Sequence, residues 1–242
     1  MGLAEILLEH QDRAVVRVGD VFIKVETDID KAMREREVLG IAPVPVPEVL
    51  WWMLGHPSLL ALARVTGAAL SGSTSSDDWR AAGQVVRRLH EEPTPEWQSW
   101  LRPGVVRHWL DDDRDWLLAH ALLDPHVVEA AHAIAADVLT QRSVDPVLTH
   151  RDLQAEHVFV DGGEVTAIID WGDAGLGDGL YDVATLTIRH RDRLDDVLDG
   201  YGEVDRAVIR AWWAERFLGE PRWLVEHGFD PAESLAGLRS LV

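Results

Sequence analysis

Two short apolar segments near residue 160 are flanked by side chains that could do chemistry. The stretch THRDLQAEHVFVDGGEVTAIIDWGDAG, residues 149–175, places Asp152 and His157 before the first segment and Asp170 after the second. Polar groups beside strand-like apolar segments are costly to bury unless they bind something. Carboxylates and imidazoles can act as general bases or as ligands of a divalent cation. These three side chains therefore either bind a ligand together or hold one another in place.

The spacing predicts where these side chains lie. The segments VFV and VTAIID flank a DGG turn and alternate in the manner of a β-hairpin. The residues before the hairpin form a loop in this interpretation, and Asp170 follows the second strand. Because the two outer ends of a hairpin are neighbours, we expect the loop carboxylate and both hairpin ends to converge. One function that fits is a metal-dependent hydrolase built on His150, Asp152, His157 and Asp170.

The amino-terminal part predicts a small sheet with one helix. Segments rich in Val and Ile, separated by polar turns, predict strands over residues 5–10, 14–19 and 21–26. A charged segment that ends at Gly40 predicts a helix of about three turns over 30–40. Alternating prolines over 43–47 force extended backbone and lead into another strand. Residues 58–65 are apolar enough for a buried strand.

The sequence from residue 66 onward predicts mainly helices. Residues 66–78 are polar and rich in small residues, and we expect a flexible connection there. Helical periodicity follows over residues 78–90, 105–123, 125–142, 181–202 and 205–228. The expected fold class is α+β in two lobes. Residues 1–66 form a small antiparallel β-sheet lobe with one helix, and residues 67–242 form a larger, mainly helical lobe that carries the hairpin.

Composition narrows the class of protein. The chain has 242 residues, enough for a sizeable core, and without cysteine it can hold neither disulfides nor thiolate metal sites. No apolar run approaches the roughly 18 residues of a membrane span, so we expect a cytoplasmic protein that contacts no membrane. The formal charge of −19 argues against a nucleic-acid partner and favours cationic ligands. Acidic residues gather over 111–115 and 192–205. The oligomeric state is left open.

Several motifs in a fixed order resemble those of the aminoglycoside phosphotransferase family, which is related by fold to the protein kinases. The family's catalytic loop, His-x-Asp followed by Asn, is similar to His150, Asp152 and then His157. Its metal motif after a short hairpin is similar to the DWG at 170–172. A downstream Gly-Asp-x-x-x-Asp pattern is similar to residues 177–182. The resemblance implies a protein-kinase-like two-lobe fold with a nucleotide-binding smaller lobe.

The resemblance implies a role for each site residue. Asp152 would accept or orient the proton of a substrate hydroxyl. Asp170 would bind the metal ion that bridges the nucleotide phosphates, because a hard divalent cation prefers carboxylate oxygen. Lys24 would contact the phosphates of ATP or GTP. Glu35 would hold that lysine by an ion pair, with Glu37 as the close competitor.

Two further assignments follow from the same resemblance. Residues 58–67 resemble the family's inter-lobe segment, so backbone groups near Ala63 and Val65 would bind the nucleotide base. Asp182 would support the catalytic loop from the start of a helix, although Asp at that position is also a common N-cap. A buried strand without any ligand remains the simpler interpretation of the inter-lobe segment.

Three departures from the family pattern bear on function. His157 stands where most members of the family carry Asn. The macrolide phosphotransferase branch resembles this sequence in having His there, and we expect the imidazole to bind the metal. Mg²⁺ is the expected ion and Mn²⁺ the alternative, because imidazole is softer than an amide oxygen. Arg151 makes an HRD triplet, but the short segment DAGLGDGL leaves no room for a protein-kinase activation loop. The turn HQDR, residues 10–13, has no glycine, so we expect weak or unselective nucleotide binding, GTP included.

The interpretation that combines these features is an O-phosphotransferase that acts on a hydroxyl of a small molecule. The acidic runs and the Trp-rich carboxy-terminal segment favour a cationic or amphipathic antibiotic as acceptor, an aminoglycoside or macrolide for example. Tryptophans at helical spacing are more often core, however, and Trp212, Trp213 and Trp223 have that spacing. A metabolic kinase for an amino alcohol or sugar is the nearest alternative. A metal-dependent hydrolase would not need Lys24. A catalytically silent nucleotide-binding module would not need Asp152.

Overall fold

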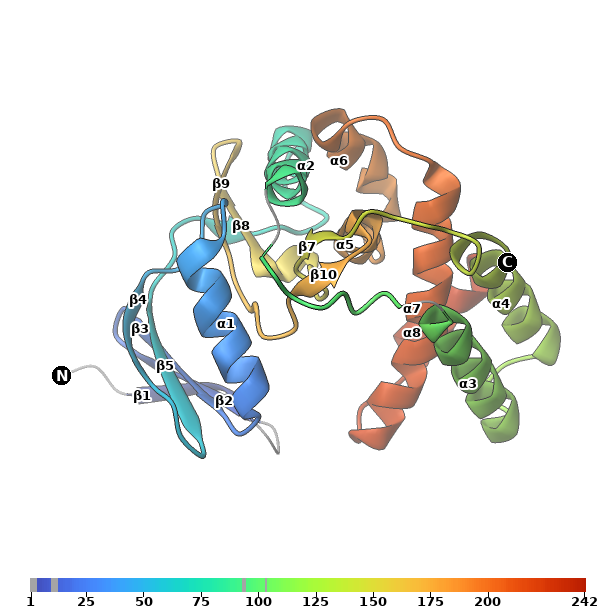
Figure 1. Ribbon diagram of the computed structural model, residues 1–242, viewed down its shortest axis with the longest axis horizontal. Coiled ribbons are helices and arrows are strands. Elements are labelled where there is room, and N and C mark those ends of the chain that lie inside the picture. Colours follow the sequence, from blue (N-terminus) through green and yellow to red (C-terminus); the bar gives the residue numbers. More distant parts are fainter. Residues whose placement is uncertain (1–3, 10–12, 93–94, 103) are drawn as a thin grey trace.

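The computed structural model describes residues 4–9, 13–92, 95–102 and 104–242, which form two lobes (Figure 1). The amino-terminal lobe contains a five-stranded antiparallel sheet of order β1-β2-β3-β5-β4. Its strands are β1 (Ala4–Glu9), β2 (Arg13–Val18), β3 (Val21–Glu26), β4 (Val49–Met53) and β5 (Ser58–Ala63). Helix α1 (Ile29–Ile41) packs against the sheet beside β3 and β5. The expected α+β two-lobe fold is confirmed.

Side chains of β2 and β3 face the other lobe. Residues paired in an antiparallel sheet share a face, and Lys24 of β3 pairs with Val15 of β2 and Leu60 of β5. Helix α1 begins at Asp28, whose carboxylate accepts hydrogen bonds from the first backbone N–H groups, and it buries Glu35 against the sheet. Residues 10–12, between β1 and β2, lie outside the described residues, so the expectation for the HQDR segment is not tested there. Arg13, its last residue, is the first residue of β2.

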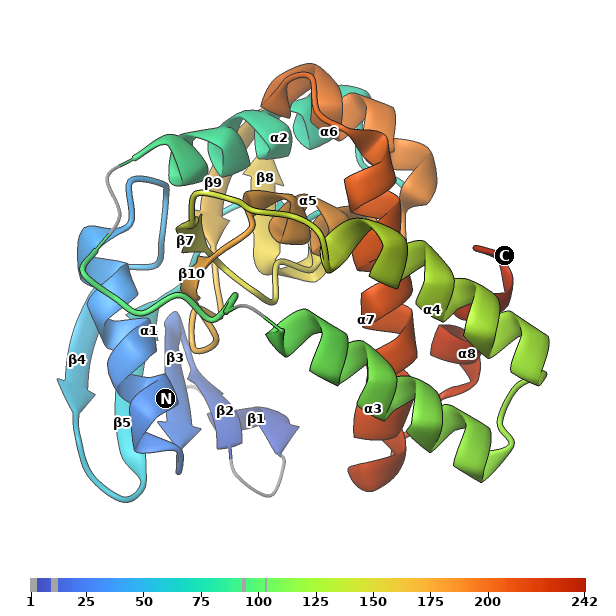
Figure 2. The ribbon, with the colours of Figure 1, turned by 45° about the vertical axis from the view of Figure 1, so that its right-hand side comes forward.

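The carboxy-terminal lobe is mainly helical. Its helices are α2 (Ser76–Glu91), α3 (Val105–His120), α4 (Pro125–Leu139), α5 (Gly179–Thr187), α6 (Leu194–Tyr201), α7 (Arg206–Glu226) and α8 (Ala232–Arg239). Helices α3 and α4 form a pair that packs beside the long helix α7 (Figure 2). Among the described residues, no helix is both long and apolar enough to cross a membrane.

Two small sheets join the lobes. The hairpin of β8 (Val158–Asp161) and β9 (Glu164–Ile168) pairs with β6 (Ala68–Ala69), and β7 (Val147–Thr149) pairs with β10 (Gly175–Gly177). The expectation of a flexible connection over residues 66–78 is therefore wrong at β6. Backbone groups there are used by the hairpin, and the buried Leu70 donates to the Val158 carbonyl at 2.9 Å.

The helical stretch expected over residues 181–202 is two helices instead of one. A short 3-10 turn, Arg191–Arg193, separates α5 from α6 and lets α6 cross α2. The two backbones meet at glycines: a Cβ on Gly83 would lie 2.0 Å from the Val197 carbonyl oxygen. A Cβ on Gly200 would lie 2.0 Å from a backbone oxygen of α2. No larger residue fits at either position without moving a helix.

The carboxy-terminal tryptophans divide between core and surface. Trp212 and Trp213 are buried, and their indole N–H groups donate to Asp178 Oδ2 at 3.1 Å and to the Ala184 carbonyl at 2.9 Å. Trp223 is half exposed at the far end of α7. The core interpretation therefore holds for two of the three residues.

Candidate active site

A cavity of about 340 Å³ lies between the five-stranded sheet and the β8–β9 hairpin. Both lobes and the segment between them line it, with Val15, Phe22, Lys24, Ala63, Val65, Phe159 and Asp170 among the lining residues. Mostly apolar walls with a few charged groups are typical of small-molecule sites. The position between lobes matches the place expected for a nucleotide.

Lys24 bridges two carboxylates at this cavity. Its Nζ atom lies 2.7 Å from both oxygens of Glu35 and 2.7 Å from Oδ1 of Asp170. Burial alone would lower the pKa of Lys24, but the two carboxylates outweigh burial and raise it. Burial alone would raise the pKa of Asp170, but Lys24 holds it well below its usual range. Glu37, the competing partner, instead accepts a hydrogen bond from Trp97 Nε1 at 3.0 Å.

The inter-lobe segment lines one side of the cavity. The N–H of Ala63 donates to the Glu48 carbonyl at 2.9 Å, and the N–H of Arg64 donates to the Asp20 carbonyl at 2.8 Å. These two donors are used inside the sheet. Ala63 and Val65 nevertheless line the cavity, and their contact with a nucleotide base stays a prediction.

Buried hydrogen bonds hold the loop that carries Asp152 in place. His150 is fully buried, and its Nε2 donates to the Ile169 carbonyl at 2.8 Å. Burial lowers the pKa of His150, which keeps its ring neutral and makes it a support instead of a base. The Asp182 carboxylate accepts from the backbone N–H groups of His150 and of the next residue at 2.8 and 2.9 Å. Asp178, not Asp182, is the N-cap of α5.

His157 joins Asp152 to Asp170. Its Nδ1 lies 2.7 Å from the Asp152 carbonyl oxygen, a contact that requires the proton on Nδ1. The lone pair is then on Nε2, which lies 3.8 Å from Asp170 Oδ2. An imidazole nitrogen beside a carboxylate is a pair of donors that could bind a divalent cation. Within the described residues, no group of three or more His, Cys, Asp and Glu side chains could hold a metal ion. An ion at this pair would take further ligands from the phosphates of a bound nucleotide.

Two site residues have strained backbone. Arg151 and Asp170 both have φ of +66°, in the left-handed region that L residues rarely adopt. The guanidinium of Arg151 lies over the Trp100 ring at 5.1 Å, so the HRD arginine packs on an aromatic side chain. Trp100 in turn covers β10, where a Cβ on Gly177 would lie 2.1 Å from its ring. Strain of this kind is typical of functional sites.

Arg216 of α7 also reaches Asp152. Its Nη2 lies 3.5 Å from Asp152 Oδ1, and its Nη1 donates to the Tyr181 hydroxyl at 3.2 Å. Gln154 Nε2 donates to the same Asp152 oxygen at 3.0 Å. Sequence reasoning missed Arg216, because it belongs to no local motif and reaches the loop from a distant helix.

Two carboxylates lie between α3 and α7. Burial raises the pKa of Asp113 to about 6, although Arg222 opposes the shift. Burial raises the pKa of Glu215 to about 7; Arg216 opposes this shift and Asp113 adds to it. One oxygen of Glu215 is buried without a hydrogen-bond partner. A buried carboxylate oxygen without a partner destabilises the folded state unless something binds it.

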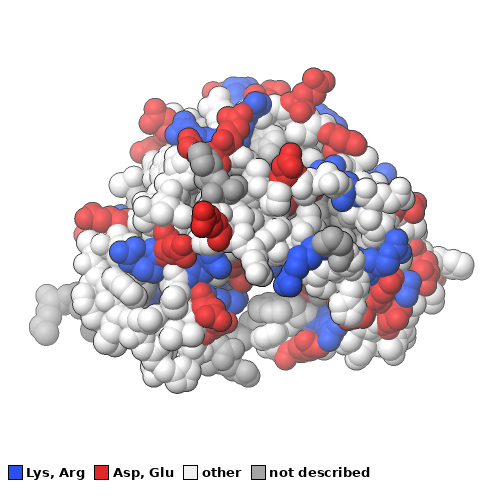
Figure 3. Space-filling model, viewed as in Figure 1, with Lys and Arg blue, Asp and Glu red and all other residues white. Residues whose placement is uncertain are grey.

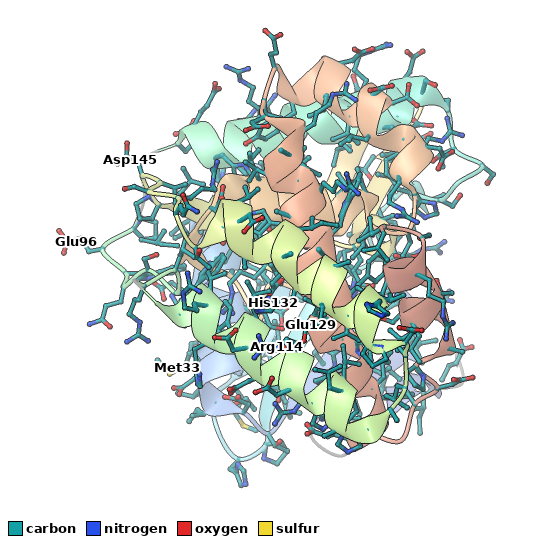
Figure 4. All side chains as sticks on the ribbon, turned by 90° about the vertical axis from the view of Figure 1, so that its right-hand side faces the viewer. Met33, Glu96, Arg114, Glu129, His132 and Asp145 are labelled. Carbon is teal, nitrogen blue, oxygen red and sulfur yellow. The ribbon has the colours of Figure 1, made fainter. Side chains whose placement is uncertain are left out.

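Other acidic residues in the two runs have structural contacts. Asp111 lies 2.8 Å from His132 Nε2 and 3.4 Å from Arg114 Nη1, and Figure 4 shows Arg114, Glu129 and His132 gathered between α3 and α4. In the second run, Asp205 caps α7. Acidic and basic side chains are interspersed on the face drawn in Figure 3. Charge clustering in the sequence therefore overstates the acidic surface available to a ligand.

The sequence of this chain is similar to those of known proteins. The profile of the phosphotransferase enzyme family matches residues 5–218. The chain belongs to this family. Hygromycin-B 4-O-kinase of Escherichia coli is 37% identical over 87 residues, which cover 30% of this chain and 25% of that protein. Aminoglycoside 3'-phosphotransferase of Escherichia coli is 29% identical over 171 residues, covering 57% of this chain and 59% of the relative. The matched part of the chain thus spans less than two thirds of either relative.

Solved structures of phosphotransferases share the fold. The GDP complex of aminoglycoside 2'-phosphotransferase-IIIa superposes with a TM-score of 0.81 at 17% identity, covering 99% of this chain and 92% of the other. A choline/ethanolamine kinase family protein from Mesorhizobium loti gives a TM-score of 0.79 at 20% identity, with coverage of 99% and 88%. The resemblance to aminoglycoside phosphotransferases is confirmed at the level of the family. The nearer affiliation with the macrolide branch stays a prediction.

Proposed function

We propose that the protein transfers the terminal phosphoryl group of ATP or GTP to a hydroxyl of a small molecule. The observation that carries this proposal is the bridge from Lys24 to Glu35 and Asp170 at the inter-lobe cavity, with Asp152 on the adjoining loop. In this assignment residues 1–66 bind the nucleotide and residues 67–242 bind the acceptor. A phosphotransferase uses nucleoside triphosphates where the cell supplies them, so we propose a cytoplasmic location.

Each residue has one task in this proposal. Asp152 accepts or orients the proton of the acceptor hydroxyl. The hydroxyl oxygen bonds to the terminal phosphorus as the bond from that phosphorus to the bridging oxygen breaks, and the electron pair leaves on the nucleoside diphosphate. Lys24 contacts the phosphates, and backbone groups of Ala63 and Val65 contact the base. Asp170 and His157 would hold Mg²⁺ or Mn²⁺, which would supply positive charge to the phosphates.

The acceptor that the site fits best is a cationic small molecule. The buried, unpartnered oxygen of Glu215 and the nearby Asp113 would provide a place for an ammonium group beside the middle of α7, next to Arg216. The relatives with the detected sequence similarity are hygromycin and aminoglycoside kinases, which supports an antibiotic and hence a resistance function. An amphipathic acceptor such as a macrolide would use the same carboxylates through its amine.

A metabolic kinase is the second candidate. The fold similarity to a choline/ethanolamine kinase family protein supports it, because an amino alcohol would also present one ammonium group to the same carboxylates. Family membership favours both candidates over the metal-dependent hydrolase.

Mass spectrometry tests the reaction directly. The protein is incubated with Mg²⁺, ATP or GTP and a panel of aminoglycosides, macrolides, amino alcohols and sugars, and one acceptor is expected to gain the mass of a single phosphoryl group. Asp152→Asn is expected to slow this transfer by about 100-fold or more, because general-base catalysis contributes about 10²–10⁴. Nucleotide binding should stay unchanged. Transfer at the wild-type rate in this variant would refute the role of Asp152.

A further inference from the structure

The phosphate end of the cavity has an unusual set of donors. Nucleotide sites commonly use backbone N–H groups of a glycine-rich turn, because a turn without side chains can approach phosphate closely. The turn from residue 10 to residue 13 contains no glycine. A triphosphate bound next to Lys24 would therefore need a different donor on the side of the cavity formed by β2.

Arg13, the first residue of β2, faces the right way to be that donor. It pairs with Glu26 of β3, as Val15 pairs with Lys24, so Arg13 shares a face with the two cavity-lining residues. It lies two residues before Val15, at the start of the strand, which is a displacement of about 7 Å at 3.3 Å per residue. That displacement is toward the carboxylate of the other lobe: Arg13 Nη1 lies 3.4 Å from Asp170 Oδ2.

The contact between Arg13 and Asp170 is too weak to be a structural clamp. The separation is long for an ion pair, and the Arg13 side chain is 40% exposed. Exposed pairs of this kind contribute little to stability. Lys24 already holds the other oxygen of Asp170 at 2.7 Å, so this carboxylate has a cation at each oxygen. A nucleotide with its metal ion would compete for Asp170 and offer phosphate oxygens to the displaced guanidinium.

We propose that Arg13 is a phosphate-binding residue of the nucleotide site, whose guanidinium takes the place of the missing glycine-turn donors. A planar guanidinium can give two parallel hydrogen bonds to phosphate, which a backbone turn does with separate N–H groups. Nucleotide affinity would then depend on the phosphates more than on the base. This agrees with the weak discrimination between ATP and GTP that we expect from the sequence. This inference rests on the proposed function.

Calorimetric titration without any acceptor tests it. Wild-type protein and Arg13→Ala are titrated with the triphosphate that the wild type binds and with the corresponding nucleoside. The dissociation constant of the triphosphate is expected to rise about tenfold in the variant, because hydrogen bonds between charged groups are among the stronger ones. The nucleoside is expected to bind equally to both. Arg13→Lys is expected to fall between them, and thermal unfolding checks that each variant is folded.

Lys31→Ala is the matched control. Lys31 of α1 pairs with Asp173 at 2.9 Å, is 44% exposed, and so is another exposed cation that joins the two lobes close to Asp170. It is expected to leave triphosphate binding within about twofold of wild type. Equal losses for triphosphate and nucleoside in Arg13→Ala, or no loss for either, would overturn the role of Arg13 alone. A wild-type protein that binds no nucleoside triphosphate would overturn the proposed function as well.

Discussion

His157 shows how one side chain can differ from a family pattern and still suit the same task. Its Nδ1 is held by the Asp152 carbonyl, which directs Nε2 to Asp170. An amide at this position would offer an oxygen; the imidazole offers a nitrogen in the same direction. At the metal site that we propose, the difference would therefore affect which ion is preferred more than whether an ion is bound.

Replacement of His157 by Asn tests that preference. His157→Asn is expected to lower the affinity for Mn²⁺-nucleotide relative to Mg²⁺-nucleotide by about three- to tenfold, because an oxygen ligand is harder than an imidazole nitrogen. Titration of each metal complex into both proteins measures the ratio. An unchanged ratio would remove His157 from the metal site.

Sequence reasoning located most side chains of the site because they belong to short local motifs. The convergence of Asp152, His157 and Asp170 was predicted from one hairpin, and the structure brings them together. The choice between Glu35 and Glu37 was left open, because both lie on one helix and only its rotation against the sheet decides. Arg216 could not be predicted, since its distance from Asp152 depends on how α7 packs.

At the scale of elements, the crossing of α2 and α6 depends on two glycines. Gly83→Ala is expected to lower the free energy of unfolding by about 1–3 kcal/mol or more, because the new Cβ would overlap the Val197 carbonyl oxygen of α6. Gly40→Ala in α1 is the control: its Cβ would lie 3.4 Å from the far end of the Arg36 side chain, an ordinary contact distance, so it is expected to be neutral or slightly stabilising. Urea denaturation measures both. Equal stabilities would mean that the helices adjust without cost.

Long elements were predictable and short ones were not. The strands of the first lobe and the helices α2, α3, α4 and α7 have a pattern that is visible in sequence, whereas α8 was not predicted and α5 and α6 were expected as one helix. Strands β6 and β10 contain too few residues for any pattern, and they exist because β8 and β7 present free edges to them. The α2–α6 crossing has no sequence signal either, because an isolated glycine in a helix usually marks only a weak position.

At the scale of the whole molecule, stability should depend on pH through Glu215. Its pKa is raised from 4.5 to about 7, so the folded protein holds this proton over a range in which the unfolded chain has lost it. The resulting stabilisation is present below the unfolded pKa and is lost as pH rises toward about 7. The loss is on the order of 3 kcal/mol, at about 1.4 kcal/mol per pKa unit.

Glu215→Gln removes this ionisation. Between about pH 5.5 and 8, the free energy of unfolding of the variant is expected to fall less with rising pH than that of the wild type. Asp112→Asn replaces an exposed carboxylate on α3 and is expected to leave the wild-type slope. Parallel slopes in wild type and Glu215→Gln would show that Glu215 titrates normally. A cationic acceptor that binds Glu215 should also favour its charged form.

The two cations on Asp170 also determine the order in which ligands can reach the site. In the protein without nucleotide, Lys24 and Arg13 already neutralise this carboxylate. Lys24 would keep Glu35 as a partner if a free divalent ion displaced it, but Arg13 would lose its carboxylate with nothing to receive its charge. A nucleotide complex brings phosphates that can receive it. We therefore expect metal ion and nucleotide to enter together as one complex, with little binding of the ion beforehand.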